Sequence, residues 1–501
     1  MLWLALHTPL LSLEAFSATL PAEAAARPVA LVAEHRIAAA NAAAQRLGVQ
    51  GGQKRATALA LAPDLLLGQA DATRDARALQ ALAQGALAFT PAVTLEGADC
   101  VLLEVQASLR YFGGLAPLRQ RLHAALAPLG HRLQPATAPT ALGAALLARW
   151  RSDGPQAADL PALQALLDAA PVWLLGPGRE HWEALQGMGL RTLSDLRVLP
   201  RAGLARRFGE GLLDDLDRAL GRRADPREWV VLPGTFDSRL ELYARADSSE
   251  QLLYGAVVLL ARLVVWAQAQ QARIGGFTLR MQHEPRHREQ HGAHTDLEIA
   301  LAEPSCDAEH LRLLLRERLA NLELPAPTLA LRLHCRQPVR SPAPNGELFP
   351  TQAGQGEGLT RLLERLRARL GDAQVQQLQP LADHRPERAT GRRPARALAA
   401  TAAPGLPAQT PQTRPLHRPV WLLPEPQPLP ERQSLPLLDG RPLQLLSGPE
   451  RVEAGWWDGA LAARDYFIAQ AADGALVWVY RARLPLAAAT EEGWFLQGRF
   501  G

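Results

Sequence analysis

The chain has 501 residues, of which 48% are hydrophobic, which is enough for several globular domains. Its formal net charge is +4, and Lys54 is its only lysine, which excludes a P-loop and almost any Schiff-base site. Because the other fixed positive charges are arginines, the composition fits either phosphate binding or a GC-rich genome. Cys100, Cys306 and Cys335 lie far apart, which argues against a zinc site or a disulfide framework and fits a reducing cytoplasm.

Residues 1–165 alternate strand-like and helix-like patterns, which predicts an α/β or α+β core. We expect a buried strand at 1–7 rather than a signal peptide, because no basic residue precedes Arg27 and Glu14 interrupts the apolar start. A further strand is expected at 99–105, where apolar residues alternate. Helices are expected at 36–47, 71–88, 115–128 and 140–150. No apolar run approaches the roughly 20 residues of a membrane span, so we expect no membrane contact.

The segment 166–228 has an all-helical pattern with short turns. Gly176 and Gly178 precede one expected helix, and Gly187 and Gly189 precede the next. Glycines at such turns let backbone N–H groups face a phosphate, as in a helix-hairpin-helix. Ordinary helix capping gives the same pattern, and this stretch alone does not separate the two interpretations.

Residues 229–338 combine four strand patterns with helices expected at 249–272 and 307–321, which predicts a compact α/β domain. From 339 to 430 the chain is rich in Pro, Gln, Ala and Arg, and we expect a mostly disordered basic linker with one amphipathic helix at 358–378.

Residues 431–501 show short β-like runs broken by Gly and Pro, which predicts a small β domain. This region is rich in aromatic residues, which either pack its core or form a protein-binding face. The candidates for partner binding are Trp456, Trp457, Tyr466, Trp478 and Trp494.

Two motifs near the amino terminus resemble the Y-family of translesion DNA polymerases. The stretch ANAAAQRLGVQGG at 40–52 is similar to the fingers helix of that family, and FTPAVTLEGADCVLLEV at 89–105 is similar to its palm strand. The tail, with DHRPE at 383–387 followed by GPERVEAGWWDG, RDYF, WVYR and WFLQG, resembles the ImuB branch of the family.

The resemblance implies an α+β multidomain protein with Y-family architecture over the whole chain. It places palm and fingers at 1–165, a helix-hairpin-helix thumb at 166–228 and an α/β little finger at 229–338. A linker at 339–430 and a small β-rich, partner-binding domain at 431–501 would follow.

The same resemblance implies that the catalytic site is degenerate. The family holds two metal ions with a D-x-D pattern on its first strand and two adjacent acids near position 99. Here no aspartate precedes Asp64, and the adjacent pair is Asp99 and Cys100. The Tyr and Arg that the family offers to the triphosphate are Ala42 and Gln45. We therefore expect no bound metal, no cofactor and no catalysis.

Two other acids were considered as replacement metal ligands. Glu14 lies beyond the strand that should carry a ligand, and strand alternation would place Glu96 on the opposite face from Asp99. Neither is expected to rebuild the metal site.

Translesion polymerases resemble one another in carrying a short clamp-binding peptide on a flexible tether. NGELF provides Asn345, Glu347, Leu348 and Phe349, and QSLPL provides Gln433, Leu435 and Leu437 as an alternative. Candidate DNA contacts share a place in the expected thumb; they are Gly176, Gly178, Arg191, Arg206 and Arg207. Arg280 and Arg286 in the expected little finger are weaker candidates.

These features together predict a non-catalytic adaptor in SOS-induced mutagenesis. By resemblance, its partners are damaged DNA, the sliding clamp (the beta subunit of DNA polymerase III), the RecA-like protein ImuA and an error-prone C-family DNA polymerase. We expect it in the bacterial cytoplasm, with the nucleoid when it is on DNA. The alternatives are an active Y-family polymerase with unusual metal ligands and a simple DNA-binding protein.

Overall fold

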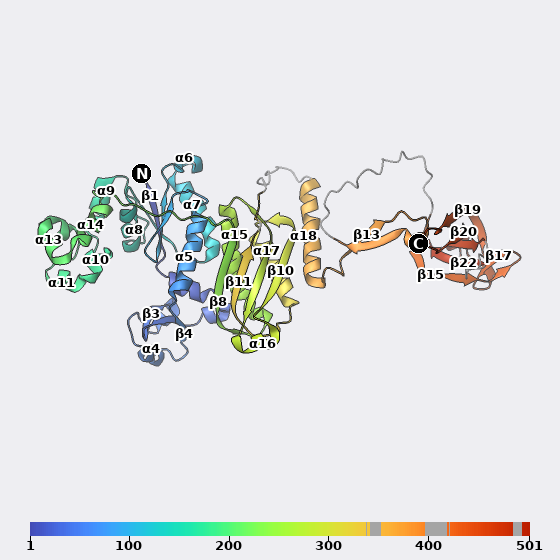
Figure 1. Ribbon diagram of the computed structural model, residues 1–501, viewed down its shortest axis with the longest axis horizontal. Helices are drawn as coiled ribbons and strands as arrows, with labels where there is room; N and C mark the ends of the chain where they lie inside the picture. Colours follow the sequence, from blue (N-terminus) through green and yellow to red (C-terminus); the bar gives the residue numbers. More distant parts are fainter. Residues whose placement is uncertain (337, 341–351, 396–417, 420, 484–492, 501) are drawn as a thin grey trace. The chain divides into compact units, whose positions relative to one another are not determined.

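The computed structural model describes residues 1–336, 338–340, 352–395, 418–419, 421–483 and 493–500. The chain divides into two compact units, residues 1–357 and 358–501. The first contains several sheets with covering helices, and the second is rich in strands (Figure 1). This confirms the expected α+β multidomain class with an additional β-rich carboxyl-terminal region.

A four-stranded antiparallel sheet, which we call the palm sheet, has the order β5-β6-β1-β7. Its strands and nearby helices are β1 (Trp3–His7), β5 (Val93–Glu96), β6 (Cys100–Glu104), β7 (Gln134–Ala138), α1 (Leu11–Ser17), α5 (Ala72–Ala86), α6 (Leu109–Phe112), α7 (Leu115–Leu126), η1 (Ala127–Leu129) and α8 (Ala141–Trp150). Strand alternation sends Trp3 and Ala5 into the core with α8, and Leu4 and Leu6 into the core with α5 and α7. All of β1 is buried, as expected.

A smaller sheet of order β3-β2-β4 lies between α1 and α5 in the sequence. It contains α2 (Ala22–Ala25), β2 (Val29–Ala33), β3 (Arg36–Ala40), α3 (Ala42–Arg46), α4 (Arg55–Leu61) and β4 (Leu66–Gln69). The helix expected at 36–47 is therefore wrong in its first half. Residues 36–40 pair with β2 as a strand, and Asn41 caps a short helix by accepting a hydrogen bond from the Ala44 N–H.

The segment that the resemblance assigns to a thumb, which we call the thumb segment, is helical throughout residues 160–219 apart from its turns. It contains α9 (Leu160–Asp168), η2 (Val172–Leu174), α10 (Gly176–Glu180), α11 (Trp182–Gly187), α12 (Leu193–Val198), α13 (Arg201–Phe208) and α14 (Glu210–Ala219). The boundary expected at 165/166 falls inside α9. The thumb helices share one continuous core with α8, which explains why the sequence pattern gives no break at that point.

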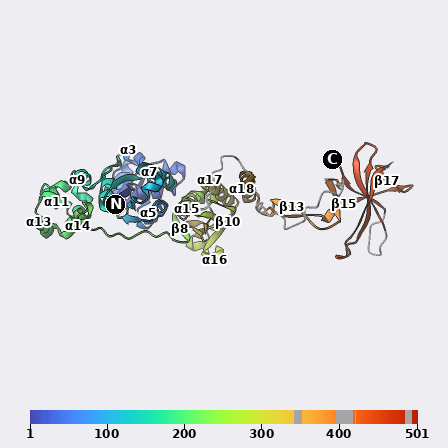
Figure 2. The ribbon, with the colours of Figure 1, turned by 90° about the horizontal axis from the view of Figure 1, so that it is seen from above.

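The sheet of the segment expected as a little finger, which we call the little-finger sheet, is antiparallel, has the order β10-β9-β11-β8, and carries two long helices. Its elements are β8 (Phe236–Ala246), α15 (Ser249–Ala269), β9 (Arg273–His283), η3 (Pro285–His287), α16 (Arg288–His291), β10 (His294–Ser305), α17 (Ala308–Ala320), β11 (Thr328–Cys335) and β12 (Pro338–Val339). The connection from α14 to β8 appears as a long extended segment in Figure 2. Its Trp229 ring stacks on Trp3 of the palm sheet, with the ring centroids 6.2 Å apart.

One described helix, α15, is long and apolar enough to cross a membrane by length and composition. The expectation that no run of this kind exists was therefore wrong. Most of its apolar stretch is buried, and Leu259, Leu263 and Trp266 belong to the little-finger core. Its apolar character is explained by packing against the sheet on one side and against α5 and α17 on others.

The second unit centres on a five-stranded antiparallel sheet of order β15-β22-β21-β20-β19. The unit and the helix leading into it contain α18 (Gln352–Leu370), β13 (Gln376–Pro380), η4 (Pro386–Arg388), β14 (Thr390–Pro394), β15 (Trp421–Leu429), β16 (Glu431–Arg432), β17 (Leu435–Leu438), β18 (Arg441–Pro442), β19 (Gln444–Ala454), β20 (Ala462–Gln470), β21 (Leu476–Ala482) and β22 (Trp494–Arg499). Separate apolar clusters cover the two faces of the sheet.

The linker expected at 339–430 requires correction. The helix expected at 358–378 ends at Leu370, before Gly371 at a φ of +88°. Residues 376–380 and 390–394 then form a β-hairpin, and β15 begins ten residues before the boundary expected at 431. Composition suggested disorder because it does not record pairing between distant segments.

The thumb offers a matched test of packing at two helical glycines. A Cβ at Gly178 would lie 2.2 Å from the carbonyl oxygen of Val172, whereas a Cβ at Gly187 meets nothing within 4 Å. We expect Gly178→Ala to destabilise the thumb by about 1–3 kcal/mol through overpacking. Gly187→Ala should be neutral or stabilising by up to about 1 kcal/mol. Hydrogen exchange of thumb peptides measures both, and equal protection in the two variants would contradict this packing.

Candidate functional site

Asp99 lies in the turn between β5 and β6, where two basic side chains hold its carboxylate. Nη2 and Nε of Arg149, from α8, donate to Oδ1 of Asp99 over 2.7 and 3.2 Å. Arg149 Nη2 also donates to the carbonyl oxygen of Glu96 over 2.8 Å. Nε2 of His7 lies 3.3 Å from Oδ2 of Asp99. The ends of β1, β5 and β6 thus meet α8 at one ion pair.

Electrostatics at this position favours a charged carboxylate and a neutral thiol. Burial by itself raises the pKa of Asp99, but hydrogen bonds from His7 and Arg149 and the Arg149 charge outweigh it and lower the pKa to about 2. Cys100 is fully buried, and burial raises the pKa of its thiol to about 12. Its sulfur therefore stays protonated at neutral pH, whereas a metal ligand must be a thiolate.

The two acids considered as replacement ligands are engaged elsewhere. Glu96 forms an ion pair with Arg227. Glu14 accepts a hydrogen bond from the Arg132 N–H over 3.0 Å and lies 3.5 Å from Nδ1 of His131. The strand-alternation argument for Glu96 does not apply, because β5 ends at Glu96 and Asp99 lies in the turn before β6, so the two acids do not share a strand.

A two-metal centre needs about three carboxylates that converge on the ions. Within the described ranges, no group of three or more His, Cys, Asp or Glu side chains is placed to hold a metal ion. A cation at Asp99 would also have to displace the Arg149 guanidinium. The residues around Asp99 therefore do not fit a pair of magnesium ions.

Ala42 and Gln45 lie on α3, where the resemblance implies contacts to a triphosphate. Both are exposed, and the Gln45 side-chain amide donates to the carbonyl oxygen of Ala40 over 2.8 Å. Neither side chain carries a positive charge or an aromatic ring. Neither residue therefore supplies the aromatic ring or the cation that the resemblance implies at its position.

The two candidate glycines of the thumb lie at the start of α10 and differ in exposure, since Gly176 is exposed and Gly178 is buried. Gly176 and Gly178 are the first and third residues of α10, and Gly178 is buried against Val172. The expectation for Gly178 was wrong, because its missing side chain allows close packing rather than access to a phosphate.

The three candidate arginines of the thumb are exposed. Arg191 precedes α12, and Arg206 and Arg207 lie in the last turn of α13. Arg207 also lies over the ring of Phe208, with its guanidinium carbon 5.7 Å from the centroid. In the part of the chain that the structure describes, none of the three forms an ion pair, so their charges face solvent.

The arginines on the open face of the little-finger sheet are neutralised by acids on neighbouring strands. Arg280 donates to both carboxylate oxygens of Asp296 over 2.8 Å each. Arg332 forms a similar pair with Asp237, with Nε 2.8 Å from Oδ1. Arg286 lies in η3 and is exposed. Arg280 is therefore a poorer candidate for phosphate contact than the thumb arginines.

The two clamp-peptide candidates differ in what the structure says of them. Asn345, Glu347, Leu348 and Phe349 lie outside the described residues. Gln433 and Ser434 have positive φ angles of 56° and 63° and form the turn between β16 and β17. Leu435 and Leu437 belong to β17. The alternative peptide is therefore part of a folded hairpin and does not lie on a flexible tether.

The aromatic residues of the tail divide into two groups. Tyr466, Trp478 and Trp494 are only 1%, 2% and 3% exposed and form parts of the core, so the expectation that they bind a partner was wrong. Trp456 and Trp457 are 72% and 52% exposed. Their rings meet edge to face with the centroids 4.7 Å apart. Only this pair presents aromatic surface to solvent among the five candidates.

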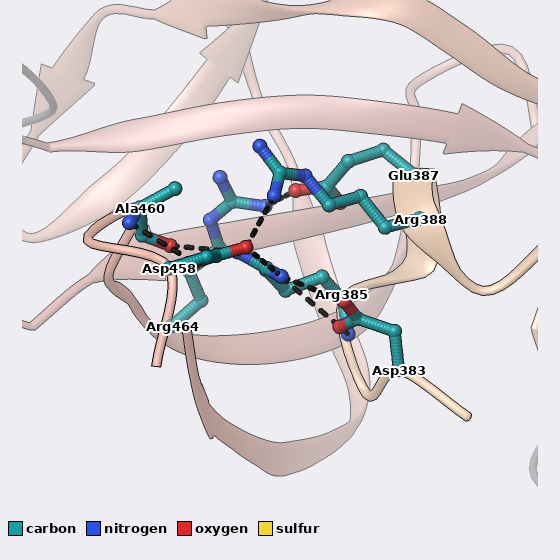
Figure 3. A network of polar contacts seen from close by, with 7 residues as sticks. All are labelled: Asp383, Arg385, Glu387, Arg388, Asp458, Ala460 and Arg464. Carbon is teal, nitrogen blue, oxygen red and sulfur yellow. Dashed lines mark hydrogen bonds and ion pairs between the residues drawn. The ribbon is translucent and has the colours of Figure 1, made fainter. Parts of the chain in front are cut away.

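An ion network holds the segment 383–388 against the carboxyl-terminal sheet (Figure 3). Arg385 donates to Asp383 over 2.7 Å and to Asp458 over 2.7 and 3.0 Å. It also donates to the carbonyl oxygen of Ala460 over 2.9 Å, and its side chain is only 3% exposed. Hydrogen bonds from Arg385 lower the pKa of Asp458 to about 2.

A second part of this network reaches into the core of the sheet. Arg464 donates to Glu387 over 2.9 Å and to the Tyr466 hydroxyl over 3.2 Å. Tyr466 in turn donates to Gln497 over 2.5 Å. The composition of 339–430 predicts a disordered linker, and these roles of residues 383–387 are therefore not visible in it. The available signal was the DHRPE motif itself, since a motif shared with a family is unusual in a plain tether.

Comparison with known proteins agrees with the motifs of the palm and tail. Residues 13–146 match the model of the impB/mucB/samB family. Protein ImuB from two strains of Caulobacter vibrioides is 28% identical over 476 residues, which span 91% of this chain and 100% of the relative. The chain is thus similar to the ImuB proteins over most of its length, in agreement with the resemblance of its tail motifs.

Solved structures show similarity at lower identity. A ternary complex of Dbh and the crystal structure of DinB from Sulfolobus solfataricus are each 16% identical, with a TM-score of 0.38. Each comparison covers 68% of this chain, and it covers 100% and 99% of the respective solved chains.

The Asp99 ion pair predicts a specific acid response. The pKa of Asp99 is lower in the folded chain than its ordinary value of 3.8, so the folded state binds fewer protons there. The pair's stabilisation is present above about pH 4 and is lost as the pH falls towards 2. We expect Asp99→Asn to flatten acid unfolding in this range, as followed by circular dichroism. Asp153→Asn, at an exposed pair with Arg151, is the control, and an unchanged wild-type slope in Asp99→Asn would contradict the assignment.

The Arg385 network predicts local unfolding when its central cation is removed. We expect Arg385→Gln to expose the 376–395 hairpin and to increase its cleavage by thermolysin several-fold in the full chain. Arg451→Gln, which removes a surface pair with Asp465, is the matched control and should cleave as wild type does. Equal cleavage of all three proteins would show that the network does not anchor the hairpin.

Proposed function

We propose that the chain is a non-catalytic Y-family polymerase homologue that acts as an adaptor in SOS-induced translesion synthesis and mutagenesis. One observation carries the proposal: Asp99 is already neutralised by Arg149, and its neighbour Cys100 is a buried, protonated thiol. Phosphoryl transfer depends on metal ions that neutralise the attacking and leaving oxygens. A palm whose remaining carboxylate is held by a guanidinium is poorly suited to that chemistry.

DNA contact is assigned to the thumb in this proposal. The exposed guanidinium groups of Arg191, Arg206 and Arg207 support it, because arginines without carboxylate partners are available to phosphates. Contacts of this kind position a protein on the DNA backbone without reading sequence, which suits a protein that must act at many lesions.

Partner contacts are assigned to the tail and to the 345–349 peptide. The proposed partners are the sliding clamp, ImuA and an error-prone C-family DNA polymerase, in keeping with the homology to ImuB. The clamp would bind Leu348 and Phe349, and the exposed Trp456 and Trp457 pair supports a protein contact on the tail. The proposed location is the bacterial cytoplasm, with the nucleoid during DNA binding.

A clamp pull-down combined with primer extension tests this proposal. We expect the intact chain to bind the clamp, the variant with Leu348→Ala and Phe349→Ala to lose binding, and neither protein to extend a primer with magnesium or manganese. A variant with Leu435→Ala and Leu437→Ala is the matched control, and it should bind as wild type does because these residues lie in a folded hairpin.

Primer extension by the intact chain would favour the alternative, an active Y-family polymerase with unusual metal ligands. Clamp binding that survives in the Leu348/Phe349 variant would remove the assignment of the anchor peptide. The absence of both clamp binding and extension would leave a simple DNA-binding protein as the better description.

A further inference from the structure

A buried guanidinium in the first unit has no acidic partner. Arg262 lies on α15 and is 5% exposed. Its Nη1 donates to the Ser238 hydroxyl over 3.3 Å, and within the described ranges no carboxylate lies within ion-pair distance of it. Burial lowers the pKa of Arg262 to about 10, so the group still carries its charge at neutral pH. A buried charge without a counter-charge is costly and is unusual in a folded protein.

A second arginine without an ion-pair partner among the described residues lines the same cavities as the first. Arg77 lies on α5 and is half-buried, and its charge also contributes to the lowered pKa of Arg262. In the described part of the chain, Arg77 has no ion-pair partner either. Two like charges that have no ion-pair partner in that part of the chain therefore lie close enough to affect each other. Their mutual repulsion would be relieved by a bound oxyanion.

Both arginines line an open cavity of about 330 Å³ between α5, β4 and β8. Arg74 and Arg239 also line it, together with the acids Asp71 and Glu241. These other charges are largely matched, because Arg239 pairs with Glu241 over 3.2 Å and Arg74 lies 3.6 Å from Asp75. Asp71 caps α5 by accepting from the N–H groups of Thr73 and Arg74.

A smaller cavity of about 120 Å³ is lined by three of the same arginines. It is lined by Arg77, Arg239 and Arg262 with the amides of Gln80 and Gln84. Its one acid, Asp237, is held by Arg332. Within the described ranges, after these pairs are formed, Arg77 and Arg262 are the arginines of the two cavities that have no ion-pair partner, and Asp71, which only backbone N–H groups hold, is the remaining acid of the larger cavity.

The elements that carry these two arginines are packed directly against each other. A Cβ built on Gly85 of α5 would lie 2.5 Å from Cγ1 of Val265 on α15, so this glycine admits the valine side chain. Val265 is buried in the palm core together with Leu82 and Leu126. Close packing fixes the separation of the two helices, and with it the positions from which the two arginine side chains extend.

We propose that this cavity is a binding site for a phosphate or pyrophosphate group, held between Arg77 and Arg262. Guanidinium groups bind phosphate oxygens through paired hydrogen bonds, and a partly buried site strengthens those bonds. The cavity is at the small end of ligand pockets, which fits a phosphate-bearing group rather than a large apolar ligand. The group comes either from a free nucleotide or from a nucleic-acid backbone. The site is separate from the thumb arginines.

Isothermal titration of the full chain with sodium pyrophosphate, at ionic strength held constant with chloride, tests the site. We expect saturable binding that weakens about tenfold or more in Arg77→Gln, because one charge-assisted contact is lost. Arg262→Gln should weaken binding similarly, and Arg77→Gln, at a half-buried position, keeps the test available if Arg262→Gln fails to fold. Arg110→Gln, an exposed arginine of the same unit, is the matched control and should bind as wild type does.

Two further titrations distinguish the sources of the phosphate. Competition by a short oligothymidylate, with its own affinity reduced in Arg77→Gln, would assign the site to a nucleic-acid backbone. Competition by ATP, with oligothymidylate binding unaffected in Arg77→Gln, would assign it to a free nucleotide. An absence of saturable pyrophosphate binding, or equal affinity in wild type and Arg77→Gln, would overturn the proposal.

Discussion

The palm sheet is buried on both faces, and this burial determines which charged groups its strands can hold. Every residue of β1 is buried, and Leu4 and Leu6 pack into the core with α5 and α7. A carboxylate within such a strand would need a cation beside it, because an unpaired buried charge is costly. The acid that remains, Asp99, lies at the end of the sheet and has Arg149 as its counter-charge. The apolar character of β1 and the pairing of Asp99 with Arg149 therefore have the same cause, which is the cost of burying an unpaired charge.

The second unit uses charges differently. Arg385 and Arg464 are largely buried, but each has its acids and hydrogen-bond acceptors in place. Such a network contributes little net stability compared with apolar packing, yet removing one member leaves the others unpaired. Because its hydrogen bonds and ion pairs require defined distances and directions, the network holds the 383–388 segment in one position on the sheet. The exposed Trp457 ring lies under Arg385, with the guanidinium carbon 5.4 Å from the ring centroid, so the same network also orients this aromatic surface.

Regular elements with a strong pattern were predictable from the sequence, and long-range pairing was not. The helix expected at 71–88 is α5, and the strands and helices of the little finger lie where periodicity placed them. The alanine-rich stretch at 36–40 became a strand because pairing with β2 overrides helix propensity. Asp99 and Cys100 were recognised from a local motif, whereas Arg149 is 50 residues away in the sequence and no local pattern connects them. Trp456 is exposed because it lies in a turn, and Trp478 is buried because of its position on β21, so residue type alone predicts neither.

The arginine-rich composition can be interpreted once the arginines that have a carboxylate partner are separated from those that do not. Composition alone fitted either phosphate binding or a GC-rich genome, because it gives each arginine equal weight. In the structure, Arg149, Arg280 and Arg385 are fixed by carboxylates and are not available to an external phosphate without breaking those pairs. Phosphate binding is therefore best sought where a guanidinium lacks such a partner. An exposed group, such as Arg206, costs little when it is unpaired, because water solvates it. The buried Arg262 has no such solvation, so its unmatched charge is the stronger indication of a ligand.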